Sequence, residues 1–274
     1  MSSGDVAFVG SVPEVYDRYM GPMIFEPYAV DIAGRVPPDA SKVLEIACGT
    51  GISTRAIRNA LSAPARLIAT DLNQEMINRA RSKFTAIENV ELRQADATSL
   101  PFPDASFDTI VCQFGMMFFP DKDAALQEVR RVLRPGGMFL FSVWDRLEKN
   151  EISLAVHEAF QSFYPDDPPR FYCVPFGLHD TWLIHSMLEA HAFTDIHWST
   201  VQKTSVSPSA QNAAAGLVEG TPVIGQIAER GAERLPDLLR EVAEEIRRRF
   251  GDHPVTTKMQ ALVWSACSPT EGAG

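Results

Sequence analysis

The sequence predicts an α/β protein built on a doubly wound sheet. Short apolar runs alternate along the chain with segments whose apolar residues recur at helical spacing, which is typical of parallel strands joined by crossover helices. The run from Val43 to Gly51, VLEIACGTG, passes from a strand pattern through a glycine turn into a helical pattern. Backbone amides at such a turn favour an anionic or carboxylate-bearing ligand. We therefore expect a ligand site at the carboxyl edge of the sheet.

The composition of the chain limits its possible binding partners and its cellular location. The chain has 274 residues, 25 basic and 35 acidic, with a net charge of −10 and no basic block longer than Arg247 to Arg249. Because a phosphate backbone is bound mainly by basic side chains, we expect no nucleic-acid partner. The chain has neither an apolar run long enough to span a membrane nor a signal-peptide pattern. We therefore expect a cytoplasmic protein with no membrane partner.

The cysteines predict neither a disulfide framework nor a metal site. They are scattered, without C-x-x-C spacing and without histidines at zinc-ligand intervals. We interpret them as small hydrophobic residues in a reducing compartment, and we expect no metal. They are Cys48, Cys112, Cys173 and Cys267.

Residues 1–40 are predicted to form an N-terminal helical lid. Gly21 and Pro22 interrupt an aromatic-rich segment, so we expect a short helix, a kink and a second helix from Pro27 with a one-sided apolar stripe. The lid leads directly into the first predicted strand.

The sheet is predicted from residues 41–145 and 181–206, followed by a closing strand within 254–268. Seven segments have strand patterns: 42–47, 66–70, 90–93, 107–113, 138–144, 196–206 and 256–267. Four helices are predicted between these strands. Two span 53–61 and 181–190, and the other two begin after the N-cap residues Asn73 and Asp121.

Two segments depart from this alternation, residues 146–180 and 207–253. The first combines an amphipathic helix with a proline-rich loop, and the second contains a strong helix at 236–250. We expect both to be cap insertions over the carboxyl ends of the strands, within one structural domain.

An acidic residue after the second strand suggests a nucleoside ligand. Asp71 ends the apolar run that follows the glycine turn, at the distance of a ribose-binding acid. The third glycine of a dinucleotide fingerprint is missing, because Thr54 occupies its position. A charge at the start of the next helix is the alternative role for Asp71.

With these residues in place, the chain resembles the class I S-adenosylmethionine-dependent methyltransferases, in the small-molecule branch that includes quinone and natural-product methyltransferases. Five ordered segments between Val43 and Trp144 carry the resemblance: VLEIACGTG, TDLNQEMI, QADATSLPF, FDTIVCQFG and VRRVLRPGG. The resemblance implies a Rossmann-like seven-stranded sheet whose last strand pairs antiparallel at the sheet edge. It also implies the cofactor S-adenosyl-L-methionine, the product S-adenosyl-L-homocysteine, and methyl transfer to an oxygen, carbon or nitrogen of a small, largely apolar molecule.

The resemblance also assigns roles to individual residues. The turn would take the methionyl group with Glu45 ordering it from behind, Asp71 would accept the ribose hydroxyls, and Asp96 would accept the adenine amino group. A turn-forming role is the alternative for Asp96. The implied cofactor-binding residues are Glu45, Ala47, Gly49, Gly51, Asp71, Leu72, Met76, Asp96, Ala97 and Gln113.

No catalytic residue is assigned from the sequence. His179 and Tyr19 are the candidates, since a hydroxyl acceptor would benefit from a general base. Methionine and phenylalanine side chains at 116–119 and aromatic residues of the caps either line the acceptor site or pack as core. The acceptor, the atom methylated and the choice between monomer and homodimer stay open.

Two other functions are compatible with a glycine turn and Asp71. One is an NAD(P)-dependent oxidoreductase, which Thr54 and the buried-strand position of Glu45 disfavour. The other is a non-catalytic protein that keeps the cofactor pocket.

Overall fold

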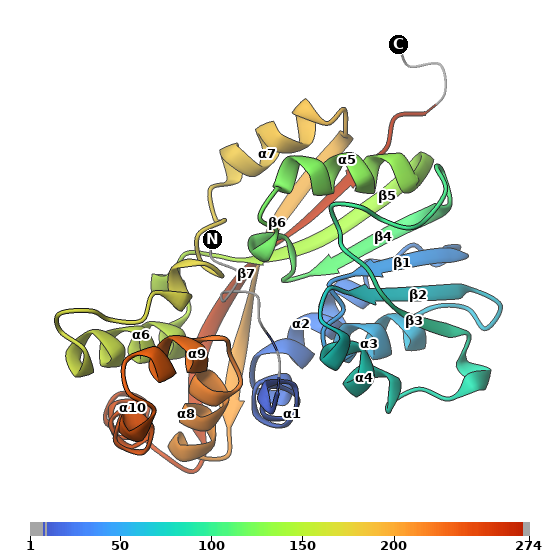
Figure 1. The fold of residues 1–274 in the computed structure, drawn as a ribbon. Coiled ribbons are helices and arrows are strands. Elements are labelled where there is room, and N and C mark those ends of the chain that lie inside the picture. The colour runs from blue at the N-terminus through green and yellow to red at the C-terminus, as the bar shows by residue number, and fades with distance from the viewer. Residues whose placement is uncertain (1–7, 9, 271–274) are drawn as a thin grey trace.

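The computed structural model describes residue 8 and residues 10–270, and these contain one seven-stranded sheet in the order β3-β2-β1-β4-β5-β7-β6 (Figure 1). All strands are parallel except β7, which is antiparallel to both of its neighbours. The predicted α/β class with an antiparallel last strand is confirmed. The strands are β1 Lys42–Ile46, β2 Arg66–Asp71, β3 Val90–Gln94, β4 Phe107–Gln113, β5 Leu133–Trp144, β6 Thr194–Ser207 and β7 Val255–Cys267.

The expected edge position of the last strand is wrong. Strand β7 lies between β5 and β6, and β6 forms the edge. The burial pattern gives the reason, because Met259 to Trp264 of β7 are continuously buried, whereas most of β6 alternates between exposed and half-buried positions. A strand buried on both faces needs a neighbour on each side, and a polar strand tolerates the edge.

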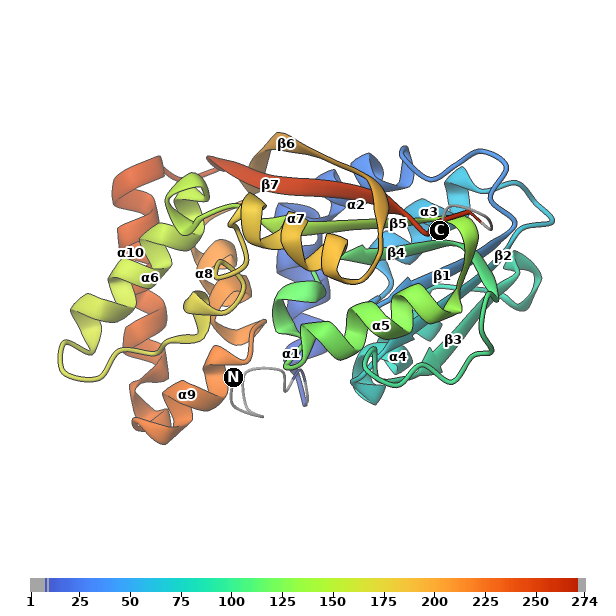
Figure 2. The same ribbon diagram turned by 90° about the horizontal axis from the view of Figure 1, so that it is seen from above.

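Helices cover both faces of the sheet (Figure 2). On one face α2, Glu26–Ala33, and α3, Ile52–Ala60, pack on Val43 and its neighbours in a single hydrophobic cluster. On the other face α5, Lys122–Val132, and α7, Thr181–Ala190, join the cluster that contains Leu44. Successive strand residues therefore serve opposite layers, as the doubly wound prediction requires.

The N-terminal helical run continues without the break that was expected at Gly21 and Pro22. Helix α1, Val12–Val15, passes into a π-helix, η2, Tyr16–Phe25, and then into α2. The wider π-helical turn accommodates Pro22, which has no N–H to donate. Residues 1–7 and 9 of the proposed lid lie outside the described residues.

Four helices gather at one end of the molecule, beyond the carboxyl ends of β5 and β6 (Figure 1). They share one hydrophobic cluster with the sheet and with η2. The division of the chain into core and cap segments stays a prediction. The four helices are α6 Glu151–Phe163, α8 Ala210–Glu219, α9 Val223–Glu229 and α10 Leu235–Phe250, and the 3₁₀ turns are η3 Ala86–Glu88, η4 Met116–Phe118, η5 Leu147–Lys149, η6 Phe171–Cys173 and η7 Ala232–Arg234.

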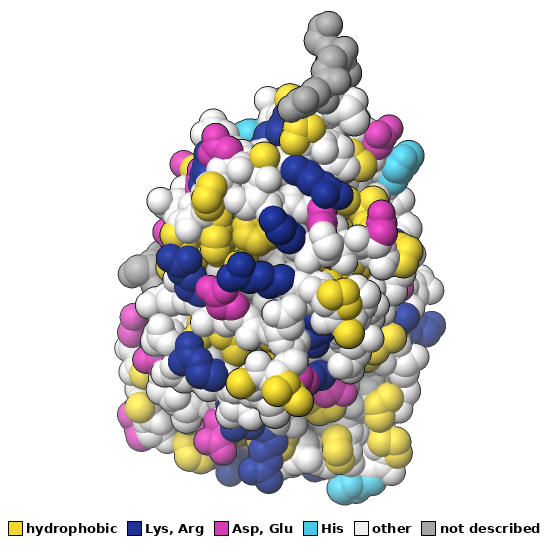
Figure 3. Space-filling model, turned by 90° about the vertical axis from the view of Figure 1, so that its right-hand side faces the viewer, with side chains coloured by type: hydrophobic (Ala, Val, Ile, Leu, Met, Phe, Trp, Pro, Cys, Tyr) yellow, Lys and Arg dark blue, Asp and Glu magenta, His cyan; other side chains and the backbone are white. Residues whose placement is uncertain are grey.

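Within the described part of the chain, no helix is both long enough and apolar enough to cross a membrane. On the face at the right of Figure 1, Lys and Arg side chains lie among acidic and hydrophobic ones (Figure 3). The four cysteines are free; Cys48 and Cys112 are buried as interpreted, but Cys173 is exposed. The expected cytoplasmic location and the expected absence of nucleic-acid, membrane and metal partners stay predictions.

Candidate active site

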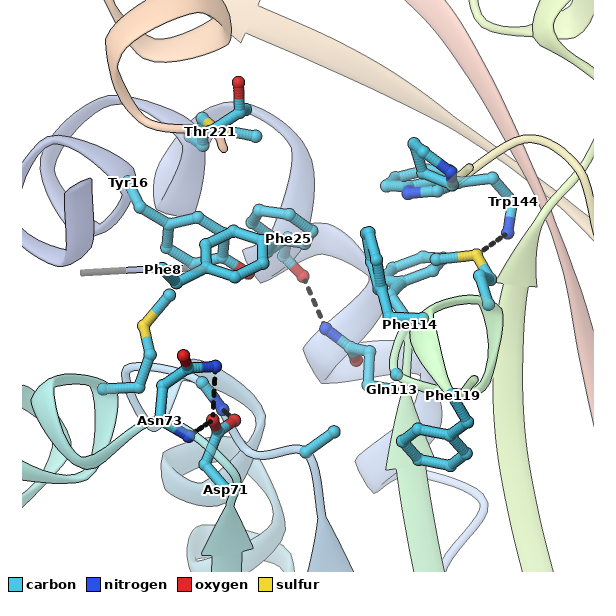
Figure 4. Close-up of a pocket in the computed structure, with 18 of the residues that line it drawn as sticks. Phe8, Tyr16, Phe25, Asp71, Asn73, Gln113, Phe114, Phe119, Trp144 and Thr221 are labelled. Atoms are coloured by element: carbon cyan, nitrogen blue, oxygen red, sulfur yellow. Dashed lines mark hydrogen bonds between the residues drawn. The ribbon is translucent and has the colours of Figure 1, made fainter. Parts of the chain in front are cut away.

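One cavity at the carboxyl edge of the parallel strands has two chemically different ends (Figure 4). At the polar end, the turn after β1 faces Asp71, the last residue of β2, and Asn73, which follows that strand. At the aromatic end, Phe114 and Trp144 lie beside each other, and Gln113 lies between the two ends. The polar end is lined by Ala47, Gly49, Asp71, Leu72, Asn73, Met76, Asp96 and Ala97, and the aromatic end by Phe25, Phe114, Phe118, Trp144, Phe171, Tyr172 and Phe176.

The glycine turn opens toward the cavity at Gly49. Its φ of +54° lies in the left-handed region, and a Cβ built there would meet only the Tyr16 hydroxyl, at 3.9 Å. Gly51 has a φ of +80°, but a Cβ there would lie 3.1 Å from the Cβ of Ala80. Gly49 therefore gives a ligand access to the main chain, whereas Gly51 lets α3 start against α4, Gln74–Arg81.

Asp71 connects the turn to the start of α4. Its Oδ2 accepts a hydrogen bond from the Gly49 amide at 2.8 Å, and its Oδ1 accepts one from the Asn73 amide at 2.8 Å. Burial raises the pKa of this carboxyl group, although these hydrogen bonds oppose the rise. Oδ2 keeps a further lone pair, whereas Oδ1 also accepts a long hydrogen bond from Asn73 Nδ2, at 3.4 Å. The two roles that the sequence left open are compatible, because Asp71 bonds the helix N-terminus and lines the cavity.

Asn73 occupies the N-cap position of α4, as predicted, but its side chain makes no capping bond. It lines the cavity instead, with its Nδ2 3.4 Å from Asp71 Oδ1. The sequence pattern predicted only a helix cap at Asn73 and no contact with the cavity. The position of Asn73, two residues after the predicted ligand-binding residue Asp71, could have indicated that it lines the site.

Glu45 lies behind the turn and does not line the cavity. It is fully buried, its Oε1 accepts a hydrogen bond from the Ser53 hydroxyl, and its Oε2 has no partner among the described residues. Burial raises the pKa of Glu45 to about 7. The residue can therefore hold α3 against β1, but it does not face a ligand directly.

Asp96 forms the turn that was its alternative role. Its Oδ1 accepts hydrogen bonds from the Thr98 amide and the Thr98 hydroxyl, both at 2.8 Å. The residue is nevertheless exposed and lines the cavity beside Ala97. Leu72, which is 48% exposed, and the buried Met76 line the same end. The assignment of these residues to a cofactor stays a prediction.

The turn after β4 separates the two ends of the cavity. Gln113 Nε2 donates to the Phe25 carbonyl at 3.3 Å, and its Oε1 is buried without a partner among the described residues. A Cβ on Gly115 would lie only 2.4 Å from the Cβ of Ala47. Gly115 therefore lets the turns after β1 and β4 touch, a requirement that was not predicted from the sequence.

Aromatic rings form a closed circuit of contacts around the cavity. All eight side chains come from lining residues, and Phe114 stacks on Trp144 at 3.9 Å beside the circuit. The successive centroid distances are Phe8–Tyr16 6.0 Å, Tyr16–Phe25 4.7 Å, Phe25–Trp144 6.3 Å, Trp144–Phe176 6.1 Å, Phe176–Tyr172 6.2 Å, Tyr172–Phe171 5.6 Å, Phe171–Phe118 6.2 Å and Phe118–Phe8 6.0 Å.

Neither candidate general base lines the cavity. His179 Nδ1 donates to the Phe176 carbonyl at 2.8 Å, and Tyr19 packs against Gly216 of α8. Among the described lining residues the carboxylates are Asp71 and Asp96, both at the polar end, and there is no histidine. Burial raises the pKa of the Tyr172 phenol, which donates to the Leu217 carbonyl. The described aromatic end therefore offers no proton acceptor that is ionised near neutral pH.

Residues 43–137 match a family model described as a methyltransferase domain. A demethylmenaquinone methyltransferase of Staphylococcus aureus is 33% identical over 159 residues. This match covers 56% of the chain and 64% of the relative, so somewhat less than two thirds of the relative's length is matched.

Solved structures share the fold at low sequence identity. A Haemonchus contortus phosphoethanolamine N-methyltransferase 2 in complex with S-adenosylhomocysteine superposes with a TM-score of 0.62 at 16% identity, covering 98% of this chain and 61% of that one. The [4+2]-cyclase SpnF superposes with a TM-score of 0.58 at 18% identity, covering 89% and 81%. Because one neighbour is a cyclase, the fold alone does not establish the reaction.

Proposed function

We propose that this chain is a class I S-adenosylmethionine-dependent methyltransferase and that it transfers a methyl group from that cofactor to a small, largely apolar organic molecule. The observation that carries the proposal is the continuity of the cavity. A polar end with an open glycine turn and a buried carboxylate leads directly into an aromatic end. Such an arrangement suits a polar cofactor whose reactive group points toward an apolar acceptor.

The polar end fits the cofactor. The space in front of Gly49 is open, and the Asp71 carboxylate suits paired hydroxyl donors: Oδ2 has a free lone pair, and at Oδ1 a ligand hydroxyl would replace the long bond from Asn73 Nδ2. The unpartnered Gln113 Oε1 at the boundary can accept a hydrogen bond from the cofactor's amino group or from the acceptor. In this proposal Ala47, Gly49, Asp71, Leu72, Met76, Asp96, Ala97 and Gln113 contact the cofactor, while Glu45 and Gly51 position the turn.

S-adenosylmethionine supplies an electrophilic methyl group on a sulfonium. The chain's contribution is to hold the acceptor in line with that methyl group and to exclude water. Phe118 and Met117 lie on η4, next to the boundary between the two ends, where soft and aromatic groups favour a neighbouring cation. The aromatic circuit supplies walls that an apolar acceptor can contact without desolvating charged groups.

The acceptor must bring a nucleophile that needs no protein base. The described aromatic end has no histidine, carboxylate or lysine, so an unactivated alcohol would keep its proton. An acidic phenol or enol, or an electron-rich carbon, is therefore favoured over an aliphatic alcohol. The relative's name, demethylmenaquinone methyltransferase, supports an acceptor of this kind.

Calorimetry with S-adenosylhomocysteine and with NADH tests the cofactor. We expect the first to bind and the second not to bind, and the opposite result would favour the oxidoreductase. Transfer of a labelled methyl group to a panel of phenols, enols and aliphatic alcohols tests the reaction. Binding of S-adenosylhomocysteine with no transfer to any metabolite of a cell extract would favour the non-catalytic alternative.

A further inference from the structure

Asp17, at the start of the π-helix η2, makes several hydrogen bonds and ion pairs that play no part in the proposed reaction. Its Oδ1 accepts hydrogen bonds from the Thr50 hydroxyl at 2.8 Å and from Lys83 Nζ. Its Oδ2 accepts from Arg79, with Nη2 at 2.9 Å and Nε at 3.0 Å. The side chain is only 10% exposed. Burial disfavours the charged carboxylate, but these hydrogen bonds outweigh it and lower the pKa of Asp17.

The partners of Asp17 belong to the elements that form the polar end. Thr50 is fully buried between the two glycines of the turn after β1. Arg79 lies in the last turn of α4, the helix that begins just after Asp71, and Lys83 follows that helix. One carboxylate thus ties η2 both to the turn and to α4. Charge-assisted bonds of this kind are stronger than neutral ones.

The residue before Asp17 covers the polar end. Tyr16 lines the cavity, stacks on Phe25 with ring centroids 4.7 Å apart, and places its hydroxyl near Gly49 (Figure 4). Because Tyr16 and Asp17 are adjacent on one helix, the contacts of Asp17 fix how closely Tyr16 approaches the turn.

We propose that Asp17 is a positioning residue that clasps η2 to the glycine turn, so that Tyr16 closes over the bound cofactor and slows its release. The inference rests on the proposed function, because the ligand it concerns is S-adenosylmethionine. It adds a role for residues outside the matched methyltransferase domain, which begins at residue 43. The clasp acts on the cofactor's residence time and leaves the chemical step unchanged.

Asp17→Asn tests the clasp, since it removes the charge and keeps the size of the side chain. Asp31→Asn is the matched control. Asp31 lies in α2, is 17% exposed and also has two cationic partners, Arg35 at 2.8 Å and Lys203 at 3.9 Å, but it does not line the cavity or contact the turn. Both variants lose a paired carboxylate from the same N-terminal helical run.

We expect Asp17→Asn to weaken S-adenosylhomocysteine binding about tenfold, mainly through faster dissociation in stopped-flow experiments, because affinity changes within one site appear mostly in the off-rate. Methyl transfer at saturating cofactor should keep its kcat, so the effect falls on the cofactor KM. Amide hydrogen exchange in residues 16–25 should be faster in Asp17→Asn even without ligand. Asp31→Asn should match the wild type in cofactor affinity and dissociation.

The outcomes separate the clasp from the proposed function. If the wild type does not bind S-adenosylhomocysteine, the proposed function fails, whatever Asp17 does. If the wild type binds and Asp17→Asn has an unchanged dissociation rate, the clasp is wrong. Equal weakening in Asp17→Asn and Asp31→Asn would mean that either change merely loosens the helical run, and this too overturns the clasp. Should Asp17→Asn fail to fold, Lys83→Met removes one cation instead and should raise the dissociation rate in the same direction.

Discussion

The polar and aromatic ends of the cavity are built on different principles. The polar end is made of backbone amides and carboxylates from the turns after β1, β2 and β3, with fixed hydrogen bonds such as Gly49 N to Asp71 Oδ2 at 2.8 Å. The aromatic end is made of rings from η2, the turn after β4, η4, β5 and residues 171–176. Directional bonds select one ligand, whereas ring contacts select shape and apolarity.

This difference indicates which part of the ligand specificity, for cofactor or for acceptor, can change by substitution. Moving one hydrogen-bonding group of the polar end disrupts a turn and a helix start together, because Asp71 bonds both. Exchanging one ring of the aromatic end changes a wall whose neighbours belong to other segments. Cofactor choice should therefore tolerate little substitution, while acceptor choice should tolerate more.

The largest expected effect concerns pH and arises at Glu45, behind the turn of the polar end. The pKa of Glu45 is raised from 4.5 to about 7 by burial, so the folded state keeps a proton that the unfolded state loses above pH 4.5. Fewer protons are then bound in the unfolded state, and stability falls as pH rises from 4.5 to about 7 and is level above it. At about 1.4 kcal/mol per pKa unit, the loss is about 3 kcal/mol.

Denaturant titrations of the wild type and of Glu45→Gln from about pH 4 to about pH 8 check this prediction. The variant carries no titrating group at this position, so its stability should lack the Glu45-dependent fall. A wild-type fall that persists unchanged in Glu45→Gln would assign the pH dependence to other groups.

Asp71→Ala should weaken S-adenosylhomocysteine binding by about 2 kcal/mol or more, because two charge-assisted hydrogen bonds to the ligand are lost. The loss of the bonds to Gly49 and Asn73 adds to the effect. Calorimetry measures the affinity, and circular dichroism verifies the fold. Unchanged affinity in a folded variant would remove Asp71 from the site.

Phe118→Ala tests the aromatic end of the cavity. Phe118 is half-buried and contacts both Phe8 and Phe171, so its removal opens the circuit with limited loss of core packing. We expect kcat/KM for the acceptor to fall about tenfold, or about 1.4 kcal/mol, with cofactor affinity unchanged. A parallel fall in S-adenosylhomocysteine affinity would show that the two ends are not independent.

The smallest expected effect on binding comes from two glycine-to-alanine variants, which distinguish backbone strain from loss of contact with the ligand. Gly49→Ala and Gly251→Ala each place a Cβ at positive φ, +54° and +80°. The first should cost about 1 kcal/mol of folding stability, and the second about 1–3 kcal/mol, because a ψ of −164° puts Gly251 in a region that is essentially confined to glycine. Gly251 has nothing within 4 Å of the added Cβ, so its variant should bind S-adenosylhomocysteine normally. Gly49→Ala should bind it more weakly. Equal affinities in the two variants would make the turn a simple connector.

The sequence alone determined the layer architecture and most of the polar end. Strands and helices follow from local apolar periodicity. Asp71 ends a strand, Gly49 and Asp96 lie just after strand ends, and a parallel sheet brings these ends to one edge. These features depend on contacts between residues that are near in sequence or fixed by strand order, so a one-dimensional pattern carries them. For the same reason the capping role of Asp121 was predicted, and its Oδ1 accepts from the Ala124 amide at 2.9 Å.

Only the tertiary structure decided the position of β7, the contact that requires Gly115, the placement of His179 and Tyr19 outside the cavity, and the aromatic circuit. Which of Phe160, Phe163, Tyr164, Phe171, Tyr172 and Phe176 line the cavity was likewise open, and the last three do. A buried aromatic side chain has the same local pattern whether it faces a core or a ligand. The distinction arises from packing between segments distant in the chain, which sequence periodicity does not encode.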